Sequence, residues 1–149
     1  MRIEDEIQQP VFHDAYQRAH VNLIFMAYWL QSELAQRFKA FDLTLPQFNI
    51  LRILRGQHPR PASVQLLIQR MIDKTSNASR IVDKLEAKAL VTRTTCPHDR
   101  RAVDVLITEK GLALLRRLDE SAALQDVGLH RLTAAEADQL NEYLNRIRG

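Results

Sequence analysis

The stretch from Pro10 to Ala40 constrains the fold most, because its apolar residues repeat every three or four positions and extend onto further helix faces. One stripe comprises Phe12, Tyr16, Ala19, Leu23, Met26, Leu30, Leu34 and Phe38, and Ile24, Phe25, Tyr28 and Trp29 add other faces. Such a helix is buried on most sides. A chain of 149 residues offers little to cover about 45 Å of it. A partner subunit is therefore the favoured cover, with packing inside one chain as the alternative.

Side chains that can cap a helix mark the starts of five shorter helices. The predicted caps are Thr44, Ser63, Asp73, Thr108 and Thr133. The helix after Thr44 is expected to end near Gly56, and the helix after Thr108 to run towards Val127. Two predicted helices, Val64–Met71 and Lys74–Lys88, are separated by a short turn, which is the helix-turn-helix outline.

From Leu90 the apolar period changes to two, which predicts strands. Two β-branched runs, Leu90–Thr95 and Ala102–Ile107, flank a polar and charged segment, Cys96–Arg101. This pattern predicts a hairpin with a long, basic tip of six residues that projects as a wing. The fold class is therefore mainly α with a small β-hairpin.

Basic charge is concentrated in the middle of the chain. Residues 52–101 contain 11 Lys and Arg against 4 Asp and Glu, a net charge of +7, whereas the rest of the chain carries −4. A local positive field of this kind attracts a polyanion to one surface, although a solvated charged face would have the same composition.

The predicted helix over Lys74–Lys88 has an apolar face that includes Val82 and Leu85, and a polar face opposite it. Its candidate DNA-binding residues are Thr75, Ser76, Asn77, Ser79, Arg80 and Lys84. Small polar side chains allow close approach to a major groove. There Arg80 can bond guanine with two parallel donors, and Asn77 can bond adenine in a similar way. Lys84 is positioned to reach the phosphate backbone.

The hairpin tip adds two arginines, Arg100 and Arg101, beside a lone carboxylate, Asp99. An arginine on a protruding ribbon can enter the narrow and electronegative minor groove. Asp99 would repel DNA, so its expected role is to hold a neighbouring arginine by paired hydrogen bonds. The alternative is a solvated turn without a partner.

Three segments together resemble the MarR family of multiple-antibiotic-resistance-type regulators. They are LTLPQFNILRIL, DKTSNASRIVDKLEAKALV and DRRAVDVLITEKGLALL, within residues 43–115. The D-x-R pattern of the wing followed by T-E-K-G at a helix start is the most specific part of the resemblance. One departure is Ala89, where the family usually has Gly before Leu-Val, and this departure questions the local turn geometry.

The resemblance implies a winged helix-turn-helix lobe over residues 43–107, with residues 10–40 and 108–149 forming a dimerisation lobe. It implies a homodimer that reads a palindromic operator in double-stranded DNA. It places Ser76, Asn77, Ser79 and Arg80 among the base-reading residues, and Asp99 and Arg101 in the wing motif. It also implies a response to small aromatic or lipophilic anions, or to oxidants, and we expect the regulator to be a repressor. The first helix offers Tyr16, His20, Tyr28 and Trp29 as candidate linings of an effector pocket.

Two alternative functions remain. Cys96 lies among basic residues that would stabilise a thiolate, so a redox-responsive regulator is conceivable. A winged helix can also serve as an adaptor for protein contacts, and this reading predicts no salt-dependent DNA binding.

Several classes of function are not expected. No nucleophile–base pair, phosphate-binding glycine loop or metal-ligand spacing is visible, so neither an enzyme nor a cofactor or metal site is expected. The one cysteine cannot form an internal disulfide, and the polar, acidic first ten residues do not resemble a secretory signal. The densest apolar run, Leu23–Leu30, is too short to span a bilayer, so we expect a cytoplasmic protein with no membrane partner.

Overall fold

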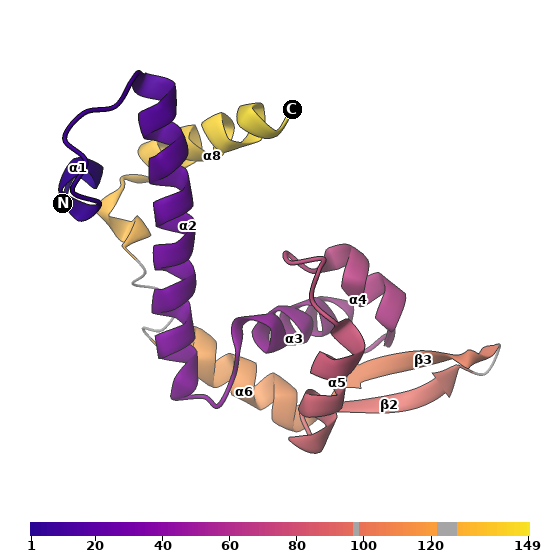
Figure 1. Cartoon of the computed structure of the whole chain (residues 1–149). Helices are drawn as coiled ribbons and strands as arrows, with labels where there is room; N and C mark the ends of the chain where they lie inside the picture. The colour runs from indigo at the N-terminus through magenta and orange to yellow at the C-terminus, as the bar shows by residue number, and fades with distance from the viewer. Residues whose placement is uncertain (97–98, 122–127) are drawn as a thin grey trace.

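The computed structural model describes residues 1–96, 99–121 and 128–149, and it describes only the backbone where the hairpin strands cover residues 95–102. The chain forms two regions (Figure 1). A long helix, α2 (Ala15–Lys39), stands upright, and the two chain termini lie on opposite sides of its upper half. A lobe of three helices and a hairpin extends from its lower end, and we call residues 43–107 the winged lobe.

Helix α2 begins at Ala15, whereas the sequence predicted a start at Pro10. Asp14 caps it, because its side chain accepts a hydrogen bond from the Gln17 amide at 2.7 Å. A short helix that the sequence did not predict, α1 (Ile3–Glu6), precedes it. The lower end is close to the predicted one, since the Leu43 amide donates to the Phe38 carbonyl and Asp42 adopts a left-handed conformation with φ 50°.

The predicted helices of the winged lobe begin where their caps indicated, with one exception. Helix α3 (Leu45–Gln57) has the complete capping box between Thr44 and Gln47. Helix α4 (Val64–Arg70) is capped by Ser63. The exception is α5 (Ala78–Ala87), which begins four residues later than predicted.

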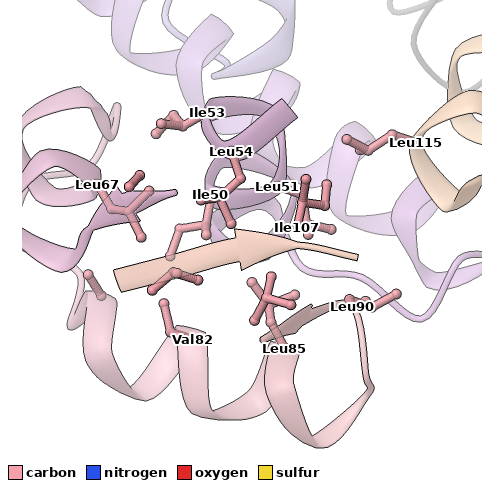
Figure 2. Close-up of a cluster of buried hydrophobic side chains, with 14 of the residues drawn as sticks. Ile50, Leu51, Ile53, Leu54, Leu67, Val82, Leu85, Leu90, Ile107 and Leu115 are labelled. Atoms are coloured by element: carbon pink, nitrogen blue, oxygen red, sulfur yellow. The ribbon is translucent and has the colours of Figure 1, made fainter. Parts of the chain in front are cut away.

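The hydrophobic core of the chain lies mainly in the winged lobe. Figure 2 shows side chains from α3, α4 and α5 pointing toward one another around the sheet. The fully buried large side chains of this lobe are Ile50, Leu51, Leu54, Leu67, Val82, Leu85, Val91 and Val105. Val82 and Leu85 confirm the predicted apolar face of α5, and their burial directs the opposite face of the helix to solvent.

The hairpin consists of β2 (Val91–Cys96) and β3 (Asp99–Ile107), which are antiparallel. A third strand, β1 (Ala62–Ser63), pairs with the other edge of β3 and was not predicted. The predicted six-residue tip is wrong, because the ladder continues past a register shift at Thr95 and Cys96 until Cys96 pairs with Asp99. Polar residues extend the strands here because backbone pairing does not require apolar side chains.

The C-terminal part contains α6 (Glu109–Glu120), capped by Thr108, and α8 (Ala134–Arg148), opened by the predicted capping box of Thr133 and Glu136. Helix α6 ends at Glu120, and residues 122–127, towards which it was predicted to run, lie outside the described residues. A short 3₁₀ turn, η1 (Leu129–Arg131), was not predicted. Gly111 of the T-E-K-G segment packs closely, since an added Cβ would lie 2.4 Å from the Leu90 carbonyl oxygen.

Much of the apolar surface of α2 and α8 faces solvent in the single chain. Phe38 is the one buried residue of α2, and α8 contains none. The exposed large apolar residues of these two helices are Tyr16, Leu23, Ile24, Met26, Tyr28, Trp29, Leu140, Tyr143 and Ile147. An apolar surface of this extent is typical of an interaction site.

The departure at Ala89 has a defined geometry. Ala89 lies in the left-handed region with φ 56°, directly after the C-cap of α5. Its amide donates to the Glu86 carbonyl at 2.8 Å, and the Leu90 amide donates to the Leu85 carbonyl at 3.0 Å. These two bonds form the Schellman motif that normally ends on glycine. The turn is therefore kept, with an alanine in a conformation that strains a Cβ-bearing residue.

We expect Ala89→Gly to raise the free energy of unfolding by about 1 kcal/mol, because glycine adopts the left-handed conformation without steric cost. The matched control is Ala87→Gly, two residues earlier in the helical last turn of α5, which should lower it by about 0.5–1 kcal/mol. Urea denaturation at one protein concentration measures both changes. A loss of stability in both variants would contradict the strain at Ala89.

Candidate nucleic-acid interface

The segment before α5 is a hydrogen-bonded turn, not the first turn of a helix. The Asp73 carboxylate accepts from the Thr75 amide at 2.9 Å and from the Thr75 and Ser76 hydroxyls at 2.6 Å each. Short polar side chains that bond to a neighbouring backbone compete with helix formation. The predicted cap at Asp73 is therefore wrong, and Asn77 caps the helix by accepting from the Arg80 amide at 3.1 Å.

These hydrogen bonds also act on the charge of Asp73. The hydroxyl of Ser76, followed by the hydroxyl and amide of Thr75, lowers the pKa of Asp73 to about 2. Hydrogen bonds donated to a carboxylate stabilise its charged form. Asp73 is therefore ionised at every physiological pH, and it continuously orders the residues that lead into α5.

The predicted DNA-binding residues of this region fall into two groups. Ser79, Arg80 and Lys84 lie on the exposed side of α5, as predicted. Thr75 and Ser76 lie in the turn before the helix, which corrects their predicted place on its face. Asn77 is the cap between the two groups, so its side-chain oxygen is already engaged with the backbone.

A hollow of about 460 Å³ connects this surface to the N-terminus of α3. Its lining comprises Thr44, Pro46, Gln47, Ser76, Asn77, Arg80, Ile81 and Lys84. Helix N-termini attract anions through their unpaired amides and dipole. The sequence predicts the capping box at Thr44 but not its position beside α5, because only tertiary packing brings the two helix starts together.

A second depression of about 560 Å³ shares Thr44, Gln47 and Lys84 with the first and adds Lys39 and Lys88. Lys88 forms an ion pair with Asp42, at 3.0 Å between Nζ and Oδ2, and also donates to the Asp42 backbone carbonyl. Lys39 belongs to α2, outside the predicted DNA-binding segment. The basic surface thus extends from Arg80 to the lower end of the long helix.

The hairpin projects outward from the winged lobe beyond α5 (Figure 1). Asp99, Arg100 and Arg101 begin strand β3, and their side chains lie outside the described residues. The same is true of the side chain of Cys96, and His98 lies outside the described residues altogether. The predicted roles of these residues therefore remain predictions.

A cavity of about 720 Å³ lies between α2 and the winged lobe. Apolar and aromatic side chains, including Tyr28, Leu43 and Met71, line it together with Lys39 and Asp73. A volume of this size accommodates a small organic molecule. Of the four aromatic and histidine side chains of the first helix proposed as linings, Tyr28 is the one that lines this cavity, and Trp29 instead faces Gly128.

The described residues contain neither a cluster of metal-ligating side chains nor a helix that could span a membrane. Within residues 1–96, 99–121 and 128–149, no three His, Cys, Asp or Glu side chains are grouped as metal ligands would be. Over the same part of the chain, every helix is too short or too polar to cross a bilayer.

Comparison with known proteins gives consistent matches. The model of the MarR family matches residues 43–103, which extend from α3 into the first half of β3. The HTH-type transcriptional regulator MhqR of Bacillus subtilis is 31% identical over 102 residues, which are 68% of this chain and 69% of that protein.

Two solved structures have the same fold over nearly the whole chain. A MarR transcription factor from Planctomyces limnophilus is 29% identical with a TM-score of 0.69, and the match covers 93% of this chain and 98% of that one. Sco3205 of Streptomyces coelicolor, a MarR family transcriptional regulator in complex with DNA, is 22% identical with a TM-score of 0.79, over 92% of each chain.

Proposed function

Because the chain belongs to the MarR family of DNA-binding transcription regulators, we propose that it binds a palindromic operator as a homodimer and reads each half-site with the start of α5. The family and the fold are those of regulators and not of enzymes. The observation that carries the proposal is the exposed polar side of α5, which borders a basic hollow at the N-terminus of α3.

The base-reading roles follow from the donors and acceptors that remain available. Arg80 is exposed and presents a guanidinium that can bond guanine O6 and N7. Asn77 uses its side-chain oxygen as the cap of α5, so we assign it a donor role through its amide nitrogen rather than a two-bond contact with adenine. Ser76 donates its hydroxyl proton to Asp73, which leaves its oxygen as an acceptor.

Phosphate contacts are assigned to Lys84 and Lys39 and to the amides at the start of α3. Thr75 and Ser79 are small enough to allow the backbone of α5 to approach the groove. For the wing, the proposal keeps Arg100 and Arg101 as minor-groove contacts and Asp99 as the residue that holds one of them.

The dimer is supported by the apolar residues that α2 and α8 expose in the single chain. We propose that residues 10–40 and 108–149 form the dimerisation lobe and that residues 43–107 form the DNA-binding lobe. A two-fold axis would then present two copies of α5 to half-sites about one helical turn of DNA apart. We propose that the protein acts in the cytoplasm as a repressor.

Regulation is assigned to the cavity between α2 and the winged lobe. Its lining includes Asp73, whose hydrogen bonds order the turn that leads into α5. A molecule in this cavity would therefore contact both the long helix and the turn before the recognition surface. We assign it to a small aromatic or lipophilic anion, with Lys39 as the cationic partner.

Arg80 is the side chain to which we assign the guanine contact. We expect Arg80→Ala to weaken binding to the preferred duplex by about 1–3 kcal/mol and binding to random DNA much less, since a base contact carries specificity. Fluorescence anisotropy across a salt series, with duplexes selected from a random-sequence pool, measures both. Arg52→Ala is the matched control, because its guanidinium bonds Asn49 within α3. If wild-type protein preferred no duplex, the proposal would fail in favour of an adaptor of protein contacts.

The proposed dimer interface includes the exposed apolar side chains of α8. Leu140 of α8 is 36% exposed, and we expect Leu140→Glu to weaken self-association by about 3 kcal/mol, because an unpaired carboxylate would be buried at the interface. Ile68 of α4 is 39% exposed, so Ile68→Glu introduces the same charge at a similar exposure in the winged lobe and should leave the dimer intact. Sedimentation velocity compares the two variants. Equal effects would argue against the assigned interface.

The cavity between α2 and the winged lobe is the proposed effector site. Millimolar 2-hydroxybenzoate should weaken DNA binding by the wild-type protein about tenfold, a typical coupling between two sites. Ala35 lines the cavity, so Ala35→Phe should fill it and abolish the response. Gln36→Phe adds the same ring at the next position, outside the cavity lining, and should retain the response. Anisotropy titrations with and without the acid provide the measurement, and a full response in Ala35→Phe would overturn the assignment.

A further inference from the structure

Arg93 connects the wing to the recognition helix through its side chain. It lies on β2, opposite Val105 of β3, and its side chain is 29% exposed. Its Nη2 donates to the Ser79 carbonyl at 3.1 Å and forms an ion pair with Asp83. Its Nε lies 3.7 Å from Glu86 Oε2. One guanidinium therefore contacts α5 at three positions that span two turns of the helix.

This arrangement determines how α5 is rotated about its own axis. The apolar contacts of Val82 and Leu85 hold the helix against the lobe, but the hydrophobic effect has no preferred direction and permits small rotations. A planar guanidinium has fixed donor directions, so its contacts oppose such rotations. Since Arg93 is anchored in the β2–β3 ladder, the rotation of α5 is set relative to the same hairpin that forms the wing.

The same contacts neutralise the acidic residues of the helix. Asp83 and Glu86 are the two carboxylates of α5, and both pair with Arg93. Unpaired, they would weaken the positive potential of a surface that faces a polyanion. Nη2 bonds to α5, and Nε is buried beside Glu86 without a hydrogen-bond partner among the described residues, so neither nitrogen is available to a ligand.

We propose that Arg93 is a positioning residue for DNA recognition: it fixes the orientation of the base-reading side of α5 relative to the wing, and it pairs both carboxylates of that helix. The inference rests on the proposed function, because its consequence is sequence specificity. Arg93 acts through Ser79, Asp83 and Glu86 and makes no base contact of its own.

The decisive variant is Arg93→Lys, which preserves the charge and removes the planar fork. We expect the ratio of affinities for the selected duplex and for a scrambled duplex of equal composition to fall about tenfold. Binding to the scrambled duplex and its salt dependence should stay unchanged, because the net charge is unchanged. The melting temperature should shift by only a few degrees, as for Arg52→Lys, whose guanidinium bonds Asn49 within a single helix.

The double variant Asp83→Asn with Glu86→Gln removes the partners instead. Binding to scrambled DNA should strengthen about threefold because two negative charges are lost, while the affinity ratio should fall. If Arg93 merely contacted phosphate, both affinities would rise together and the ratio would not change, and that result would overturn the proposal. An unchanged ratio in Arg93→Lys would overturn it as well.

Hydrogen exchange measured without DNA separates this inference from the proposed function. Amides of α5 should exchange about fivefold faster in Arg93→Lys than in the wild type, whereas amides of α3 should not change. Equal exchange in α5 would refute the positioning role whatever the protein binds. A wild-type protein that prefers no duplex would instead refute the proposed function. The exchange rates of α5 would then still show whether Arg93 positions that helix.

Discussion

The burial of one side of α5 is the constraint on which the rest of the winged lobe depends. Ala78, Val82 and Leu85 pack into the shared core with side chains from α3 and β3, and this packing leaves Ser79, Arg80 and Lys84 in solvent. The apolar side supplies most of the free energy that holds α5 against the winged lobe, because each buried Val or Leu side chain contributes about 1.5–3 kcal/mol. The polar side, to which we assign the DNA contacts, faces solvent because the apolar side is buried.

Directional contacts then refine what apolar packing leaves undetermined. Asp73 orders the turn before α5 through the hydroxyls of Thr75 and Ser76, and Asn77 caps the helix by accepting from the Arg80 amide. At the far end, the Schellman motif through Ala89 directs the chain into β2. Arg93 of the hairpin adds an ion pair with Asp83 of α5. Each contact is individually modest, but together they specify the start, the end and the rotation of one short helix.

The two regions of the chain satisfy different requirements. The winged lobe buries its apolar side chains mainly against one another, whereas α2 and α8 leave much of their apolar surface in solvent. The cavity lined by Tyr28, Met71 and Asp73 lies where these regions meet. A molecule bound there would touch both regions at once, as the proposed regulation requires.

Local signals in the sequence predicted much of this architecture. The caps at Thr44, Ser63, Thr108 and Thr133 predicted four helix starts correctly, and the change of period at Leu90 predicted the hairpin. These predictions succeeded because a cap bonds residues three positions apart, and because a strand shows its period within a few residues. The resemblance within residues 43–115 indicated the family.

The errors arose where several local solutions compete. Asp73 and Asn77 are both good caps, and the sequence alone favoured the first, whereas in the folded chain Asp73 bonds the side chains of Thr75 and Ser76. Strand β1 is two residues long and exists only because β3 offers its edge. Strand β3 begins in a charged segment because its ladder bonds are made by backbone and not by side chains.

The sequence by itself determined the helix and strand types, most helix starts, the apolar side of α5 and the family, because these depend on residues close together in the chain. Only the tertiary structure decided that Thr44 and Lys39 border the same surface as Arg80, that Arg93 pairs with both carboxylates of α5, and that Tyr28 shares a cavity with Asp73. These contacts join residues far apart in the chain, and their geometry follows from how whole elements pack against a common core.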